Sequence, residues 1–246
     1  MESPGTHLAQ ARQMLREATR VSVLTGAGIS AESGVPTYRG TGGIWSGFSA
    51  EDLASAGGFR RDPVKVWDWH NQRRMNLKVI KPNPGHRALA ELERQVTARG
   101  GSFCLATQNI DGLHQAASSR NVLELHGTIL AIKCSVCNQR RHIGFEPIKE
   151  IQKCPRCGSA MRPDIVWFGE MLPQDVWRPA AQAARECDLF LSVGTSAVVY
   201  PAAGLIELAV QSGAASIEVN LEPTAASGLV DIALHGEAGE ILPKLI

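Results

Sequence analysis

The chain has 246 residues, enough for one well-buried core or for a core with a smaller module. Lys and Arg number 25 against 24 Asp and Glu, and this near-neutral balance argues against a polyanionic partner such as nucleic acid or an acidic membrane. No apolar run approaches the ~20 residues that cross a bilayer, and the N-terminal MESPGTHLAQ lacks the basic start and apolar centre of a signal peptide. These features predict a soluble, cytoplasmic protein.

The first predicted elements are a helix, a strand and a glycine-rich turn. Apolar residues recur at helical spacing from residue 6 to residue 20, and the β-branched run 21–24 follows as a strand. Directly after it, Gly26-x-Gly28-x-x-Ala31 fits the pattern in which small residues let the backbone approach a pyrophosphate. A tight strand-to-helix turn without any ligand explains an isolated match equally well.

Three further apolar runs, at residues 103–106, 189–193 and 217–219, are short and are separated by helical or loop segments. Strands that are apolar throughout and alternate with helices are typical of a parallel sheet covered on both faces. The sequence therefore predicts an α/β fold with a doubly wound parallel sheet.

Two segments are too long to be simple connections within such a sheet. More than seventy residues separate the first strand from Ser102, and a loop-rich, cysteine-bearing stretch lies between Leu130 and Met161. We expect residues 38–74 and 131–160 to form a smaller lobe, helical in the first part. Residues 1–37, 75–130 and 161–246 then form the larger domain.

Polar residues follow the apolar run 103–106 abruptly, in the stretch ATQNIDGLHQ. Gln108, Asn109 and Asp111 are expected at a ligand, because the carboxyl ends of strands line the crevice of an open α/β sheet. Asp111 precedes Gly112 and Leu113 and can instead cap a following helix. Capping accounts for only one of the three.

Four of the six cysteines form two pairs, Cys134-x2-Cys137 and Cys154-x2-Cys157. Two such pairs offer Zn²⁺ four thiolate ligands in a tetrahedron, which leaves no open position for catalysis. A redox role for one pair leaves the other unexplained. We therefore predict one structural Zn²⁺ in the smaller lobe, and inert core positions for Cys104 and Cys187.

Several motifs in a fixed order resemble one known family. GAGISAESGVPTYRG, TQNIDGLHQ, LELHG at residues 123–127 and VGTS at residues 193–196 are similar to motifs of the sirtuins, the NAD-dependent protein lysine deacylases. The resemblance spans the chain from Thr25 to HGEAGE near its end. It implies a Rossmann-like NAD-binding domain beside a zinc-binding and helical lobe, NAD as co-substrate, and acyl-lysine proteins or peptides as partners. It does not indicate an oligomeric state.

The resemblance also implies the residues of the NAD site. His126, in LELHG, is implied as the general base, with Asn109 near the nicotinamide ribose and Asp111 on the carboxamide. Arg39 is implied in the loop that helps bind the cofactor, and Tyr38 stands where the family more often has Phe. The cofactor-binding residues implied as a set are Gly26, Ala27, Gly28, Ser30, Thr37, Tyr38, Arg39, Trp45, Gln108, Asn109, Ile110, Asp111, Gly194, Thr195, Ser196, Asn220, Leu221, Glu222 and Ala238.

The implied reaction removes an acyl group from lysine and gives nicotinamide and acylated ADP-ribose. Two alternatives stay open: mono-ADP-ribosyl transfer to protein, and a non-enzymatic NAD-sensing module. Taken without the resemblance, a single His beside apolar residues is more often structural than catalytic. A module that only binds NAD has no need of a base, so His126 favours an enzyme.

The helix predicted around VWDWHNQRR bears on the choice of acyl group. His70 and Arg73 share one face of such a helix. The sirtuins that remove succinyl, malonyl and glutaryl groups have Tyr-x-x-Arg here and an Ala in a preceding Asp-Leu-Ala segment. This chain keeps Ala54 and Arg73 but has His70 for the Tyr. The resemblance thus implies activity on acidic acyl groups alongside acetyl, with His70 donating one hydrogen bond. It also implies that the run Val166, Trp167, Phe168 and Gly169 pairs with the substrate backbone.

Overall fold

The computed structural model describes residues 4–38 and 43–246. Six parallel strands form the main sheet in the order β3-β2-β1-β7-β8-β9. The order reverses between β1 and β7, which makes that point the topological switch of a doubly wound sheet. The strands are β1 (Arg20–Thr25), β2 (Ser102–Thr107), β3 (Val122–Glu124), β7 (Leu189–Val193), β8 (Ala215–Asn220) and β9 (Ile232–His235).

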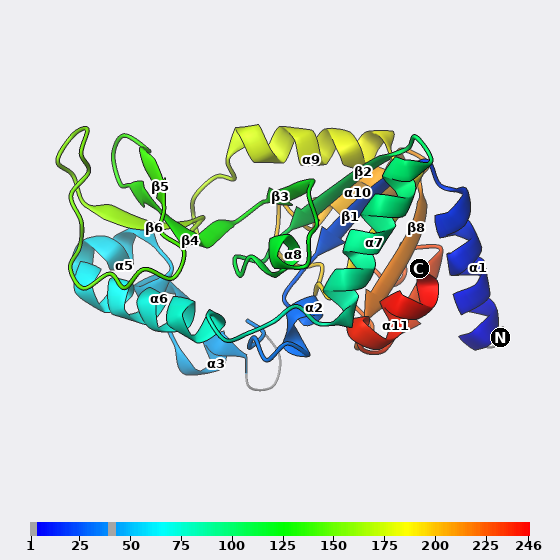
Figure 1. Cartoon of the computed structure of the whole chain (residues 1–246), viewed down its shortest axis with the longest axis horizontal. Coiled ribbons are helices and arrows are strands. Elements are labelled where there is room, and N and C mark those ends of the chain that lie inside the picture. Colours follow the sequence, from blue (N-terminus) through cyan, green and yellow to red (C-terminus); the bar gives the residue numbers. More distant parts are fainter. Residues whose placement is uncertain (1–3, 39–42) are drawn as a thin grey trace.

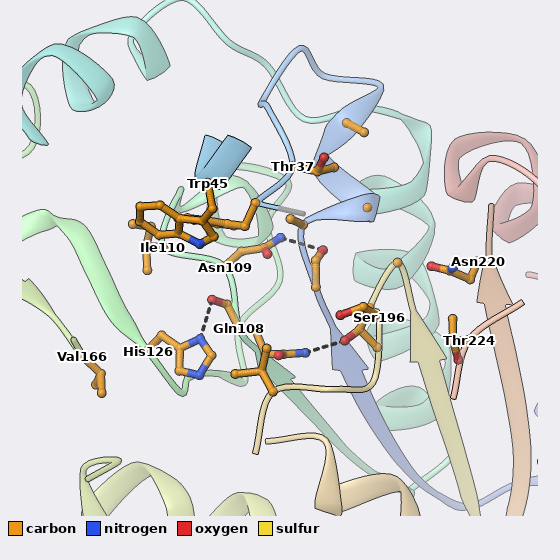
Figure 2. A pocket seen from close by; sticks show the side chains of 18 of the residues that line it. Thr37, Trp45, Gln108, Asn109, Ile110, His126, Val166, Ser196, Asn220 and Thr224 are labelled. Carbon is orange, nitrogen blue, oxygen red and sulfur yellow. Dashed lines mark hydrogen bonds between the residues drawn. The ribbon is translucent and has the colours of Figure 1, made fainter. Parts of the chain in front are cut away.

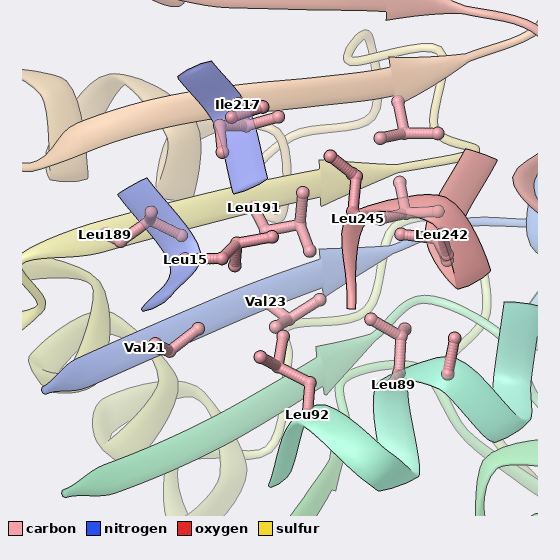
Figure 3. Packing of buried hydrophobic residues seen from close by; sticks show 14 of the residues in the cluster. Leu15, Val21, Val23, Leu89, Leu92, Leu189, Leu191, Ile217, Leu242 and Leu245 are labelled. Carbon is pink, nitrogen blue, oxygen red and sulfur yellow. The ribbon is translucent and has the colours of Figure 1, made fainter. Parts of the chain in front are cut away.

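Three helices cover one face of this sheet: α1 (Pro4–Glu17), α7 (Pro84–Ala98) and α11 (Ala238–Leu245). Figure 3 shows Leu89 and Leu92 of α7 and Leu242 and Leu245 of α11 packed over the strands. Helix α7 begins where the sequence signals it, because the Asn83 side chain accepts hydrogen bonds from the amides of the first turn and proline follows.

The opposite face is covered by α9 (Gln174–Glu186) and α10 (Gly204–Gln211). Small residues of α9, among them Ala180 and Ala184, let that helix approach Leu24 and Phe190 of the sheet closely. With apolar helices on both faces, the strands are buried throughout, and this explains why they read as continuous apolar runs. The predicted doubly wound α/β fold is confirmed.

A second, antiparallel sheet lies at the other end of the molecule, next to a group of helices (Figure 1). Its order is β5-β4-β6, with β4 (Gly127–Cys134), β5 (Arg140–His142) and β6 (Met161–Ile165). Helices α5 (Ala56–Arg61) and α6 (Pro63–Leu77) pack against it and share its apolar cluster. Four short helices complete the described chain: α2 (Gly28–Ala31), α3 (Ile44–Gly47), α4 (Ala50–Leu53) and α8 (Leu113–Ala116).

The second sheet extends beyond residues 131–160 at both ends, since β4 starts at Gly127 and β6 runs to Ile165. Gly127 is where the chain passes from the main sheet to the second one. Its φ is +76°, and a Cβ there would lie 2.1 Å from the Asp164 carbonyl oxygen, so only glycine fits. The division into two lobes stays a prediction. If it holds, the second segment of the smaller lobe begins near Gly127 and ends near Ile165. In the described part of the chain, no helix is long and apolar enough to traverse a bilayer.

Candidate functional site

A cavity of about 1020 Å³ opens at the carboxyl ends of β1, β2, β7 and β8, beside the switch point. Figure 2 shows its labelled side chains running from Val166, His126 and Trp45 at one end to Asn220 and Thr224 at the other. The space is large enough for a dinucleotide together with part of a second substrate. Segments of both the main sheet and the smaller lobe line it.

The glycine-rich turn after β1 lines the middle of this cavity and packs closely against the loop after β7. The Gly26 amide donates to the Val193 carbonyl over 3.0 Å, and the Gly28 amide donates to the Gly194 carbonyl over 2.8 Å. A Cβ on Gly28 would lie 2.7 Å from Gly194 Cα. These two glycines therefore join the loops after β1 and β7, and their own amides are already engaged. Their role in this structure is close approach between the two loops, and they are not free donors to a phosphate.

Gln108 and Asn109 bring side chains from the end of β2 to the cavity wall. Gln108 Nε2 donates to Thr195 Oγ1 over 2.8 Å, which links β2 to the loop after β7. Asn109 Nδ2 donates to the Gly26 carbonyl over 3.0 Å and to Ser30 Oγ over 3.2 Å. Asn109 is buried, and this pair of bonds fixes the plane of its amide beside the cavity.

Asp111 and Ser30 lie behind Asn109 and do not line the cavity. Ser30 Oγ donates to Asp111 Oδ2 over 2.8 Å, while Asp111 Oδ1 accepts from the Leu113 amide over 3.0 Å. Asp111 is therefore not the N-cap of α8, which is Gly112, although one of its oxygens accepts from the first amide of that helix. Burial raises the pKa of the Asp111 carboxyl, and the bonds from Leu113 and Ser30 oppose that rise. Its contact with a carboxamide stays a prediction.

His126 sits where the chain leaves β3 for β4, and its ring is partly buried in the cavity wall. His126 Nδ1 lies 3.0 Å from the Gln108 carbonyl oxygen (Figure 2). A carbonyl oxygen only accepts, so Nδ1 carries the proton and Nε2 keeps a lone pair. Burial lowers the pKa of His126, partly offset by the bond to Gln108. The ring is therefore a neutral, oriented base at neutral pH.

The far end of the cavity is lined by loops after β7, β8 and β9. Thr195, Ser196, Asn220, Leu221, Glu222 and Ala238 line it as predicted. The amide of Gly239, next to Ala238, donates to the Glu32 carboxylate over 2.6 Å, which ties the first turn of α11 to the segment after α2. Glu32 and Thr224 also line the cavity and were missed. Thr224 had a usable signal, since it lies only two residues after Glu222.

The near end is lined by an aromatic wall, defined here as Tyr38, Trp45, Trp69 and Phe168, in which the ring centroid of Trp45 lies 5.7 Å from that of Tyr38 and 5.9 Å from those of Trp69 and Phe168. Sequence reasoning missed Trp69, because helical periodicity marks it equally as a core residue. Ala54 and Arg73 also line this end.

The run 166–169 lines the near end, but the amides of its first three residues are engaged within the protein. Val166 donates to the His126 carbonyl and Phe168 to the Ala54 carbonyl, both over 2.9 Å, while Trp167 donates to Glu170 Oε2 over 3.0 Å. Backbone pairing with a substrate, which stays a prediction, would have to use other groups of this run.

His70 lines the cavity but differs from its predicted role. Its Nε2 lies 3.0 Å from the Leu53 carbonyl oxygen, so the ring proton is already donated to that oxygen. Burial, with a smaller contribution from Arg73, lowers the pKa of His70 to about 3. The ring is neutral at neutral pH, and its other nitrogen is a buried acceptor without a partner in the described residues. This geometry does not support a hydrogen bond from His70 to an acyl carboxylate.

Apart from Ser30 and Asp111, every predicted cofactor or substrate residue that the structure describes lines this one cavity. Arg39 lies outside the described residues. The structure thus brings together side chains that the sequence spreads from Gly26 to Ala238.

The four paired cysteines converge as predicted. All four sulfur atoms lie within 4.8 Å of one another, with Cys134 Sγ 3.4 Å from Cys157 Sγ and Cys137 Sγ 3.5 Å from Cys154 Sγ. Tetrahedral Zn²⁺ with ~2.3 Å bonds requires sulfurs about 3.8 Å apart, so the set fits the ion. All six cysteines are free thiols. The cluster lies at the end of β4, in the smaller lobe, and a Zn²⁺ held there has no open position.

Comparison with known proteins gives a consistent result. Residues 26–201 match the model of the Sir2 family. A protein of Thermus thermophilus named NAD-dependent protein deacylase is 48% identical over 239 residues, which cover 97% of this chain and 94% of that protein.

Solved structures of Sir2 proteins are also similar to this chain. A Sir2 homologue in complex with NAD is 42% identical and superposes with a TM-score of 0.88, covering 96% of this chain and 91% of the other. A His-to-Ala Sir2 variant with a deacetylated p53 peptide and 3′-O-acetyl-ADP-ribose is 32% identical, with a TM-score of 0.86 and coverage of 97% and 96%.

Proposed function

The chain belongs to the Sir2 family, and from this premise we propose that it is an NAD-dependent protein lysine deacylase. The substrates are NAD and an acylated lysine side chain in a protein or peptide. The products are nicotinamide, the free lysine and O-acyl-ADP-ribose. The one observation that carries the proposal is the state of His126, whose Nδ1 proton is held by Gln108 while Nε2 stays available at the cavity.

The cavity supports a reaction in two stages. First, the acyl-lysine carbonyl oxygen attacks the anomeric carbon of the nicotinamide ribose, and the bond from that carbon to nicotinamide breaks. Holding both substrates in one cavity makes this attack effectively unimolecular. Asn109, fixed by Gly26 and Ser30, is placed in the wall where it can orient the ribose.

In the second stage His126 acts as general base. Its Nε2 accepts a proton from the ribose hydroxyls, so that the 2′-oxygen attacks the carbon that was the acyl carbonyl. Water completes the balance: its oxygen ends in the ester, and the lysine leaves as amine. Because the Gln108 carbonyl stabilises the protonated ring through Nδ1, it supports the proton transfer and keeps the ring oriented.

For the acyl group, we propose acidic chains such as succinyl or malonyl alongside acetyl. Arg73 lines the near end, and in residues 4–38 and 43–246 no carboxylate lies within 4.0 Å of its guanidinium. A guanidinium fork matches a carboxylate in charge and geometry. Ala54 keeps the wall small beside it.

The reaction class is tested with NAD labelled in the adenosine half and an acetylated or succinylated peptide. Release of nicotinamide with soluble acyl-ADP-ribose is expected, and His126→Ala should lower kcat by about 10²- to 10⁴-fold. Label on protein would instead indicate mono-ADP-ribosyl transfer, and binding without nicotinamide release would indicate an NAD sensor. Either result contradicts the proposal.

The acyl preference is tested with Arg73→Met on matched succinyl and acetyl peptides. The succinyl rate should fall far more than the acetyl rate, because only the succinyl chain ends in a charge. Equal losses on both peptides would remove Arg73 from acyl recognition. We also infer a cytoplasmic location, since a reducing compartment keeps all six thiols free.

A further inference from the structure

We propose that the Tyr38 hydroxyl is the second half of the acid-recognition subsite, and that Tyr38 and Arg73 together hold the terminal carboxylate of the acyl group. Tyr38 is thus a specificity-determining residue that lies outside helix α6, 35 positions before Arg73. The inference rests on the proposed function and names the group that selects its acidic substrates.

The two side chains are already paired. Arg73 Nη2 donates to the Tyr38 hydroxyl oxygen over 3.0 Å, across 35 positions of sequence. Because the phenol oxygen accepts this bond, its own proton is left to donate to a ligand. Arg73 has no other hydrogen bond in the described part of the chain, so most of its five N–H donors remain for the same ligand.

Aromatic rings hold the cation in place. The Arg73 guanidinium carbon lies 4.5 Å from the Trp69 ring centroid and 5.1 Å from the Tyr38 ring centroid. Stacking of this kind fixes a guanidinium without neutralising it. Trp45 packs beside both rings, with centroid distances of 5.7 Å to Tyr38 and 5.9 Å to Trp69.

The neighbouring imidazole does not compete for this role. His70 is neutral and donates its proton to Leu53, so it offers an acidic chain neither charge nor a donor. Among the described residues that line this end of the cavity, Arg73 supplies the cation and Tyr38 the hydroxyl donor beside it. An acetyl group carries no charge for them to recognise.

The test is Tyr38→Phe, which keeps the ring and removes only the hydroxyl. The measured quantity is the ratio of kcat/KM on a succinyl-lysine peptide to kcat/KM on the same acetyl-lysine peptide. The ratio should fall about 10- to 100-fold, the effect of one lost hydrogen bond to a charged group. Any change in NAD binding lowers both rates equally and cancels in the ratio.

Tyr200→Phe is the matched control, because Tyr200 is the only other tyrosine, it lines the same cavity, and its hydroxyl donates to Glu207 and not to Arg73. Its ratio should not change. In a double-mutant cycle, Tyr38→Phe should add little to Arg73→Met, since both act on one carboxylate. An unchanged ratio for Tyr38→Phe, or full additivity with Arg73→Met, would overturn the inference.

Calorimetric binding of the two peptides separates this inference from the proposed function. If neither peptide is turned over, the deacylase proposal fails, but a succinyl-specific loss of affinity in Tyr38→Phe still supports the subsite. If turnover is normal and the succinyl peptide binds both proteins equally, the subsite fails and the deacylase proposal stands.

Discussion

His126 illustrates how a backbone carbonyl sets the chemistry of a side chain. The Gln108 carbonyl fixes the tautomer, and burial lowers the pKa of the ring below its ordinary value of 6.5. The neutral ring is the base, so lowering the pKa extends the active form toward acid. We predict that the acidic limb of kcat/KM on an acetyl peptide has its midpoint below pH 6.5. A profile measured from pH 5 to 8 checks this, and a midpoint above 6.5 contradicts it.

At the scale of elements, a buried carboxylate organises the loop after β8. Glu218 is 1% exposed, and its two oxygens accept hydrogen bonds from the hydroxyls of Thr224 and Ser227. Those hydroxyl oxygens accept in turn from loop amides: Ser227 Oγ from Thr224 over 2.8 Å, and Thr224 Oγ1 from Ala226 over 3.0 Å. Because a carboxylate only accepts, it forces both hydroxyls to donate inward and to accept from the loop.

This arrangement predicts that Glu218→Gln loosens the far end of the cavity, where Thr224 lies (Figure 2). The side-chain amide nitrogen of Gln is a donor, and it would face a hydroxyl that already donates toward residue 218. That hydroxyl could then keep either its bond to residue 218 or its bond from the loop amide, but not both. KM for NAD should rise roughly tenfold while KM for the peptide changes little. Glu186→Gln, on the exposed surface of α9, is the control. Equal rises in both KM values would indicate general destabilisation.

The zinc cluster is an element-scale feature too, because it closes the loop at the end of β4. We predict about one Zn²⁺ per chain by metal analysis, and almost none in Cys134→Ser, since the three remaining thiolates bind far more weakly. Removal by a chelator should abolish deacylation and lower the melting temperature, because the second sheet packs against α6, the helix that carries Arg73 at the cavity. Full activity in a metal-free sample would contradict this.

For the molecule as a whole, three buried histidines make stability depend on pH. Burial lowers the pKa of His70 and His114 to about 3 and that of His86 to about 4. Below pH 6.5 these three histidines bind protons in the unfolded chain but stay neutral in the folded chain. Stability is therefore full above pH 6.5 and falls as the pH drops toward about 4, by up to ~1.4 kcal/mol per pH unit for each histidine.

Denaturant unfolding between pH 7 and 4.5 checks this prediction. His114→Gln removes one of the three groups, so its stability should fall less steeply with acid than that of the wild type. Comparing slopes cancels the contribution of the zinc thiolates, which both proteins share. Parallel slopes would show that His114 does not contribute.

Local patterns were enough for four of the six strands of the main sheet, whereas the edge strands β3 and β9 were not predicted. The apolar runs at 103–106, 189–193 and 217–219 all proved to be strands, with ends within two residues of those seen. Short runs of this kind are specified by their own composition, because the strands are buried on both faces. The convergence of the four cysteines was also predictable, because the two-residue spacing within each pair is a local pattern.

Long-range contacts decided what the sequence could not. Three such contacts are the pairing of β4 with β6, the hydrogen bond between Ser30 and Asp111, and the hydrogen bond between His70 and the Leu53 carbonyl. Each joins segments that are separated along the chain. The bond between Tyr38 and Arg73 spans 35 residues and leaves no trace in either local pattern. A sequence thus determined which residues stand at strand ends, because periodicity and spacing are local. Only the tertiary structure decided which of them turn toward the ligand, because direction depends on the partners that packing brings near.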